Sequence, residues 1–137
     1  MGILTIEQAR KAHQGARICE GAIIYDGARI YDGAIIYDGA IIYDGARIYE
    51  GARIYDGAII CKGAENVINT FVIADIGNTK NITAMKCDAG LIIGIGCMNG
   101  YRGHNVENTL VEIRKKYSED HLYFDAIKLI EKWYEQL

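Results

Sequence analysis

The chain has no proline, no cysteine pair at metal-binding spacing, no large excess of one charge and no long apolar run. A formal net charge of −3 disfavours nucleic-acid binding, which needs a basic surface. The longest apolar run, residues 89–98, is too short and too rich in glycine to span a bilayer, so no membrane segment is expected. Residues 1–14 contain no apolar signal-peptide core, which favours reduced cysteines and a cytoplasmic location.

The dominant feature of the chain is a six-residue repeat. From Gly15 to Lys62, eight consecutive hexads follow the pattern G-A-x-I-x-x without one inserted residue. In residues 27–32, Ala and Ile alternate with Arg and Tyr, which predicts a short strand with one buried face. The Asp-Gly pair at each corner favours a turn, because glycine tolerates a positive φ. A helix is excluded, since a glycine in every hexad would cost about 1 kcal/mol each.

These hexads carry a resemblance to known proteins. Counted from each isoleucine, they are similar to the hexapeptide repeat of left-handed parallel β-helices, in which three hexads make one triangular coil. The whole chain resembles short phage and prophage proteins that join G-N-A-R-V-Y-type hexads to a tail of the form I-G-S … T … G-C-F-x-G-T … E-F … Y … A-I. The matching segments are Ile76-Gly77-Asn78, Thr83, Gly96-Cys97-Met98-Asn99-Gly100 and Tyr123 with Ala126-Ile127. The chain departs from that pattern at Met98, where the family has Phe, and by an insertion over residues 101–108.

The ends of the repeat predict further elements. Thr5 and Gln8 fit a capping box that opens a helix over about residues 6–13. Strands are expected over residues 67–74, 82–87 and 91–95, and helices from Asn105 or Asn108 to about 117 and over about 120–135. The predicted fold is therefore mainly β: a short left-handed parallel β-helix with an N-terminal capping helix and a C-terminal β-hairpin plus two helices. The expected segments are an N-terminal cap (1–14), the hexad β-helix (15–64), C-terminal strands (65–100) and C-terminal helices (101–137).

If three hexads make a coil, residues 18 positions apart stack, and the outward residues fall on three faces. Face one carries Arg17, Ile35 and Arg53, with Cys19, Tyr37 and Tyr55. Face two carries Ile23, Ile41 and Ile59, with Tyr25, Tyr43 and Cys61. Face three carries Arg29 and Arg47, with Tyr31 and Tyr49.

Face two is the predicted subunit interface. Its outward isoleucines form an apolar strip of the kind that marks an interface, because burying apolar area contributes about 25 cal/mol per Å². We expect either the tail of the chain or a second subunit to cover it. Because hexapeptide β-helices form trimers, the resemblance favours a homotrimer, with a dimer as the alternative. The expected interface residues are Ile23, Tyr25, Ile41, Tyr43 and Ile59.

Faces one and three are the predicted ligand-binding surfaces. Arginine offers a planar fork of donors to phosphate or carboxylate, and tyrosine offers a ring for stacking. The alternative is that these are solvated strand residues whose arginines pair with nearby aspartates. The candidate binding residues are Arg17, Arg29, Tyr31, Arg47, Tyr49 and Arg53.

Signals for catalysis, metals and cofactors are weak. His104 is the one candidate base, and it lies in the insertion rather than in the hexads. The corner acids precede glycines, where turn geometry favours Asp, so neither a metal nor a cofactor is expected. Asn81 begins an N-x-T glycosylation sequon, but no secretory route is expected.

The sequence therefore favours a non-enzymatic, oligomeric binding or scaffold protein of phage type in the cytoplasm of a host cell. Such a protein would block a host defence protein or sequester a phosphorylated or nucleotide signal through the Arg-Tyr faces or the subunit junctions. One alternative is an enzyme similar to hexapeptide acyltransferases that uses His104 as its base. Another is a structural β-helix that self-assembles by end-to-end stacking.

Overall fold

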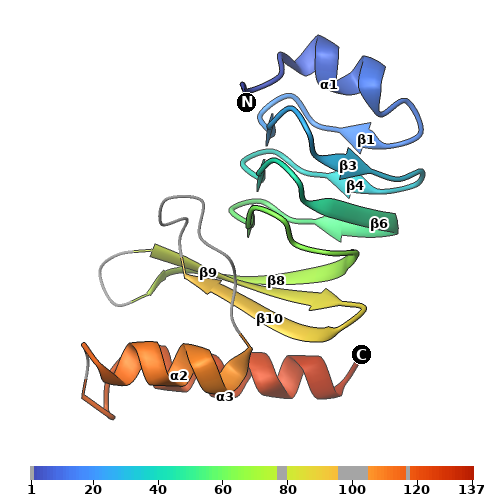
Figure 1. Ribbon diagram of the computed structural model, residues 1–137. Helices are drawn as coiled ribbons and strands as arrows, with labels where there is room; N and C mark the ends of the chain where they lie inside the picture. The colour runs from blue at the N-terminus through green and yellow to red at the C-terminus, as the bar shows by residue number, and fades with distance from the viewer. Residues whose placement is uncertain (1, 77–79, 96–104, 117) are drawn as a thin grey trace.

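The computed structural model describes residues 2–76, 80–95, 105–116 and 118–137. Helix α1 (Ile6–Ala12) precedes the hexads, and helices α2 (Val106–Arg114) and α3 (Leu122–Glu135) end the chain. The tail strands are β8 (Val67–Ile76), β9 (Lys80–Cys87) and β10 (Gly90–Ile95). The hexad strands are β1 (Arg17–Ile18), β2 (Ile23–Ile24), β3 (Arg29–Ile30), β4 (Ile35–Ile36), β5 (Ile41–Ile42), β6 (Arg47–Ile54) and β7 (Ile59–Ile60). Figure 1 shows the hexads stacked beneath α1, with β8–β10 between them and the two C-terminal helices.

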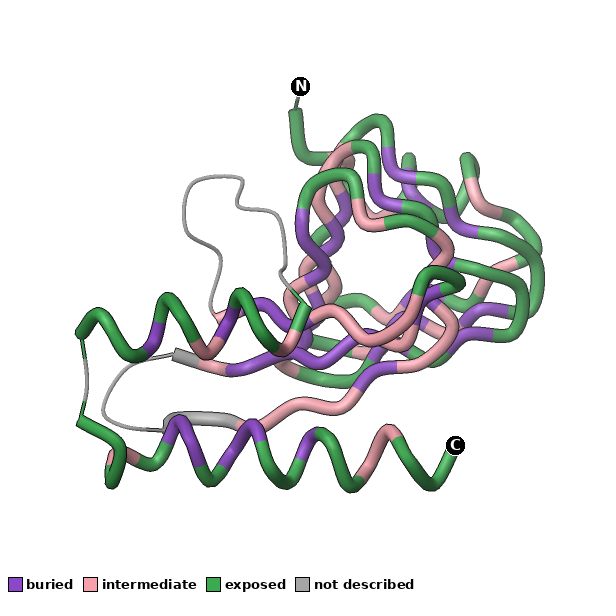
Figure 2. Tube along the Cα trace, turned by 60° about the horizontal axis from the view of Figure 1, so that its bottom comes forward, coloured by how far each residue is buried: buried purple, intermediate pink, exposed green. Residues whose placement is uncertain are grey.

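The hexads stack in a parallel register of 18 residues. Ile35 pairs with Arg17 on one side and with Arg53 on the other, and Ile41 lies in the same way between Ile23 and Ile59. The inward alanines and isoleucines of the hexads form the core of the stack and are buried, except Ala16 and Ala22 of the first two hexads, which are partly buried. Figure 2 shows these buried segments along the inner side of the stacked turns. The three outward columns of the sequence analysis thus lie in register.

The fold class predicted from the hexads is wrong. In place of a mainly β, left-handed parallel β-helix with an appended β-hairpin, the described chain is mixed α/β, with three helices and a mixed seven-stranded sheet. The hexad strands, of two residues each except the eight-residue β6, are spaced along the chain and do not form a separate short repeat solenoid. They join the tail strands in the order β1-β4-β6-β8-β9-β10, with β3 also paired to β6, while β2-β5-β7 form a second sheet. The reason is that β8 pairs in parallel with β6 and antiparallel with β9, which makes hexads and tail one sheet.

The N-terminal edge of the stack is closed by residues 2–12. The backbone N–H of Leu4 donates to the carbonyl of Ile24 at 2.9 Å, and the Nε of Arg10 donates to the carbonyl of Ile18 at 3.0 Å. Helix α1 begins with the capping box predicted at Thr5 and Gln8, with both reciprocal hydrogen bonds present. Backbone acceptors that would otherwise lie unpaired at the end of the stack therefore have partners.

The C-terminal edge of the stack is closed by polar side chains of the tail. The Thr83 hydroxyl accepts from the N–H of Ile59 at 3.0 Å, and the Thr70 hydroxyl donates to the carbonyl of Arg53 at 3.1 Å. The Asn81 amide donates to the carbonyl of Gly57 at 3.2 Å. These groups take the positions that a further hexad would occupy.

The tail has a core of its own, formed where β8–β10 pack on the two C-terminal helices. Its buried residues include Ile82 and Ile93 from the strands, Ile113 from α2, and Ile127 and Ile130 from α3. The positions of the helices agree with the apolar periodicity of the sequence. Helix α2 starts at an Asn105 cap, and α3 starts after His121, whose Nδ1 accepts from the N–H of residue 123 at 3.1 Å.

Substituting Thr83 tests whether the tail completes the hexad edge. In Thr83→Val the side chain keeps its shape but cannot accept from the N–H of Ile59, so we expect a loss of about 1–3 kcal/mol in the free energy of unfolding. Urea denaturation measures it. Thr83→Ser, which keeps the hydroxyl and loses one methyl, serves as the control. Equal stability of the Val variant and the native chain would contradict this role.

Candidate functional site

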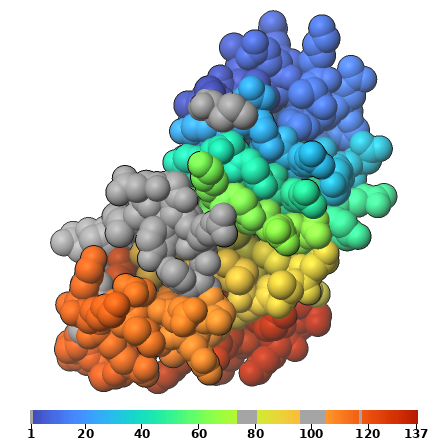
Figure 3. All heavy atoms as spheres, in the orientation of Figure 1, coloured from blue at the N-terminus to red at the C-terminus, as the bar shows by residue number. Residues whose placement is uncertain are grey.

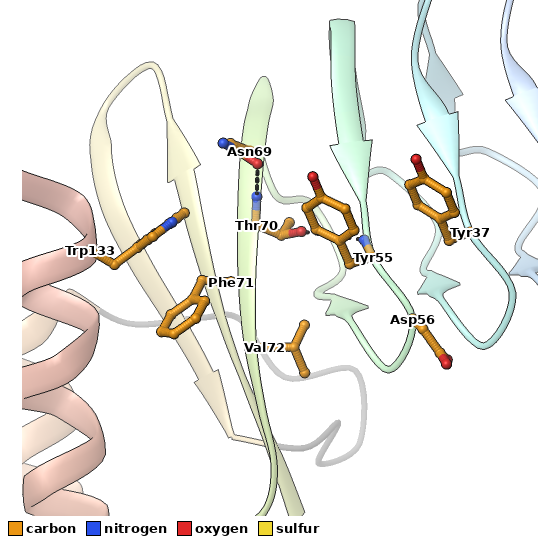
Figure 4. Close-up of a pocket in the computed structure, with 8 residues that line it drawn as sticks. All are labelled: Tyr37, Tyr55, Asp56, Asn69, Thr70, Phe71, Val72 and Trp133. Atoms are coloured by element: carbon orange, nitrogen blue, oxygen red, sulfur yellow. Dashed lines mark hydrogen bonds between the residues drawn. The ribbon is translucent and has the colours of Figure 1, made fainter. Parts of the chain in front are cut away.

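Two tyrosines of face one form an aromatic pair beside the junction of hexads and tail. Because Ile36 of β4 pairs with Ile54 of β6, the next residues, Tyr37 and Tyr55, lie one above the other. Their rings stack with centroids 5.4 Å apart and planes inclined by 8°. Figure 4 shows both hydroxyls directed to the same side of the strands.

A second aromatic pair comes from the tail. Phe71 lies on β8 and Trp133 on α3, and their rings stack with centroids 5.4 Å apart and planes inclined by 21°. Strand β8 lies next to β6, with Asn69 paired to Arg53, so Phe71 comes close to the hexad tyrosines. The two pairs together line one surface depression (Figure 4).

Some polar groups between the two pairs bond to the backbone, and others keep donors or acceptors that a ligand could use. The Thr70 hydroxyl makes two hydrogen bonds to the backbone: it donates to the carbonyl of Arg53 and accepts from the N–H of Tyr55 at 3.4 Å. The Asn69 Oδ1 accepts from the N–H of Thr70 at 2.9 Å, which orients the amide. The Asn69 Nδ2 is turned away from this bond in Figure 4. The indole N–H of Trp133 is a further donor in the lining.

These residues, with Asp56 and Val72, line a depression of about 510 Å³, which we call the junction groove. Its volume lies in the usual range for small-molecule sites, which are mainly apolar with a few placed polar groups. The lining holds four aromatic rings, one carboxylate and no basic side chain. In Figure 3 the surface runs without interruption from the hexads, in blue and green, to the tail, in yellow and red.

Face three has the predicted register, and its surface carries acidic residues as well as the predicted arginines and tyrosines. Arg29 pairs directly with Arg47, and both side chains are exposed. The rings of Tyr31 and Tyr49 meet edge to face at 6.3 Å, and they line a hollow of about 320 Å³ with Asp32 and Glu50. Among the described residues, no acidic side chain forms an ion pair with an arginine of the hexads, Arg17 and Arg53 included. The alternative in which these arginines pair with aspartates is therefore not what the structure shows.

Face two is only partly covered. Ile23 is 39% exposed, and Tyr25 stacks on Tyr43 with centroids 4.6 Å apart. The tail reaches the lower end of this face, where Ile59 bonds to β9 and Cys61 is buried. At the upper end, an antiparallel bridge from Ile3 reaches Tyr25. Among the described residues, the tail contacts the strip only at its Ile59 end.

The predicted catalytic candidate His104 and the Gly96–Gly100 motif lie outside the described residues. Within the described ranges, no cluster of three or more His, Cys, Asp or Glu side chains could hold a metal ion. Burial lowers the pKa of His13, which ends α1 at the edge of the stack. No helix within the described ranges is long and apolar enough to cross a membrane.

Sequence reasoning placed Tyr37 and Tyr55 in one column but did not single them out as a site. It missed Asn69, Phe71 and Trp133, because no spacing in the sequence connects a hexad with β8 and a C-terminal helix. The single tryptophan of the chain was the available signal, since an indole is large and carries a polar N–H.

Comparisons of the chain with protein-family models, with curated proteins and with solved structures found no match. The resemblance to phage hexad proteins therefore stays a prediction from the repeat and tail motifs.

The buried thiols give a test of the packing between stack and tail. Burial raises the pKa of Cys87 to about 11, with smaller contributions from Asp88, Cys61 and Glu65. A raised thiol pKa means that the unfolded chain loses this proton first, so the contribution of Cys87 to stability falls as the pH rises from about 9 toward 11. Near neutral pH, where the thiol stays protonated, the nucleophilic thiolate is scarce.

We expect iodoacetamide at about pH 8 to label the half-buried Cys19 well before Cys61 and Cys87. Peptide mass mapping after timed quenching measures the three rates separately. Labelling in concentrated urea, where all three should react alike, is the control. Equal rates for Cys19 and Cys87 in the folded protein would show that the tail does not seal this end of the stack.

Proposed function

We propose that this protein is a non-enzymatic binding protein that acts as a homo-oligomer. The observation that carries the proposal is the junction groove, where two stacked aromatic pairs from distant parts of the chain line one depression. Building such a surface exposes large rings, and Tyr55 is 41% exposed. Exposed aromatic rings beside placed polar groups are the usual composition of a binding site.

The isoleucine column of face two is the proposed subunit interface, with a homotrimer favoured over a dimer. Ile23, Ile41 and Ile59 stand in register on a sheet of their own, so they offer a flat apolar strip. Covering that strip removes apolar area from water at about 25 cal/mol per Å², and the part of the tail that the structure describes reaches one end of it. A second copy of the chain supplies a matching strip of the same chemistry.

A second candidate function uses the arginines of face three. Like charges directly opposite each other on paired strands destabilise a sheet, and Arg29 and Arg47 stand in this relation without an ion pair among the described residues. A phosphate or carboxylate bound between them would relieve the repulsion. This favours the interception of a host component, either a phosphorylated signal or an acidic edge of a defence protein.

Native mass spectrometry of Ile41→Glu tests the interface. The wild-type chain should appear as an oligomer, and the variant as a monomer, because the charge would be buried in the middle of the strip. Ile35→Glu places the same charge at the equivalent outward position of face one and should leave the oligomer intact. A monomeric wild type, or equal behaviour of the two variants, would refute the interface.

The double substitution Arg29→Glu and Arg47→Glu tests the anion site. Isothermal titration with inorganic phosphate and with a nucleoside triphosphate should show binding to the wild type and its loss in the variant. The oligomer should persist, since face three is separate from face two. Anion binding that is unchanged in the double variant would show that the arginines of face three do not bind the anion.

A further inference from the structure

We propose that the junction groove binds an uncharged carbohydrate, with a pyranose ring set against its aromatic lining. This inference rests on the proposed binding function and names the ligand class of the groove. Three properties of the lining carry it: the arrangement of the rings, the available polar atoms and the balance of charge.

The arrangement of the rings fits a flat, partly apolar ligand. A pyranose has one face of C–H groups, which packs favourably on the electron-rich face of an aromatic ring. The rings of Tyr37–Tyr55 and of Phe71–Trp133 are stacked nearly parallel, so each ring keeps one face turned away from its partner, and a pyranose packs on such an outer face. An ammonium ligand instead needs several ring faces turned toward one point, which rings stacked in parallel pairs do not provide.

The available polar atoms suit hydroxyl groups. The Asn69 Oδ1 is held by the N–H of Thr70, so the Nδ2 has a fixed direction and remains a donor for the ligand. The hydroxyls of Tyr37 and Tyr55 lie on the same side as Asn69 and can accept from a ligand as well as donate to it, and the Trp133 indole supplies a further donor. A sugar hydroxyl both donates and accepts, and it matches this mixed set.

The balance of charge disfavours an anion. None of the residues that line the groove is Lys, Arg or His, and Asp56 adds a negative charge at its edge. A phosphate would therefore be repelled here, in contrast to face three. An uncharged ring with a rim of hydroxyls meets neither repulsion nor the cost of burying its own charge.

The experiment screens the full chain on a glycan array that contains neutral, sialylated and sulfated oligosaccharides. The best neutral glycan is then titrated while the emission of Trp133, the single tryptophan, is recorded. We expect saturable binding with a change in Trp133 emission. Tyr55→Ala should weaken it about three- to tenfold, the range of one lost aromatic contact. Tyr49→Ala, at 42% exposure against 41% for Tyr55, removes an equivalent ring from face three and should bind like the wild type.

Asn69→Asp is the second variant. It keeps the oxygen that accepts from the N–H of Thr70, and so preserves the fold of β8, but replaces the donor Nδ2. Its affinity for the neutral glycan should fall by a similar factor. Circular dichroism of each variant confirms that the fold is unchanged.

Three results would overturn the inference: no neutral glycan bound on the array, emission changes only with tetramethylammonium or anionic glycans, or neutral binding unaffected by Tyr55→Ala. Native mass spectrometry separates this failure from that of the proposed function. An oligomer that carries an adduct lost in Tyr55→Ala would keep the binding function and reject the sugar class. A chain that is monomeric and binds none of the array glycans, inorganic phosphate or the nucleoside triphosphate would reject both.

Discussion

The backbone groups at the two open ends of the hexad stack must find hydrogen-bond partners, and much of the structure follows from this requirement. Inside the stack each hexad pairs with the next, but the first and last strands have no neighbour from the repeat. A buried polar group left unpaired costs about 1–3 kcal/mol. Leu4 and Arg10 meet this need at one end, and Thr70, Thr83 and Asn81 meet it at the other.

The closure at the C-terminal end also builds the site. Because β8 lies beside β6, the aromatic residue Phe71 comes next to a tyrosine column that began in the hexads. Helix α3 packs on the same tail strands and brings Trp133 to the edge of the groove. The proposed ligand site thus forms where the tail closes the repeat, because its lining needs residues from both the hexads and the tail.

Near-identical hexads present three surfaces of different chemistry. At the first outward position the residue is either Ile or Arg, and the 18-residue register collects these choices into columns. Face two becomes apolar, face three carries opposed arginines, and face one leads into a groove whose lining holds no basic side chain. In the proposed function, face two joins subunits, while the other two faces hold ligands of different charge.

Local chemistry in the sequence determined the capping box at Thr5 and the two C-terminal helices, since each depends on neighbouring residues. The 18-residue columns came from the resemblance to coils of three hexads, and the strand pairing agrees with them. Only the tertiary structure decided the fold class and the groove. The parallel pairing of Val67 with Ile48, and the contact of Trp133 with Phe71, join segments with no periodic relation. A strand edge specifies that it needs a partner but not which segment supplies one, because backbone hydrogen bonds are the same for every residue except proline.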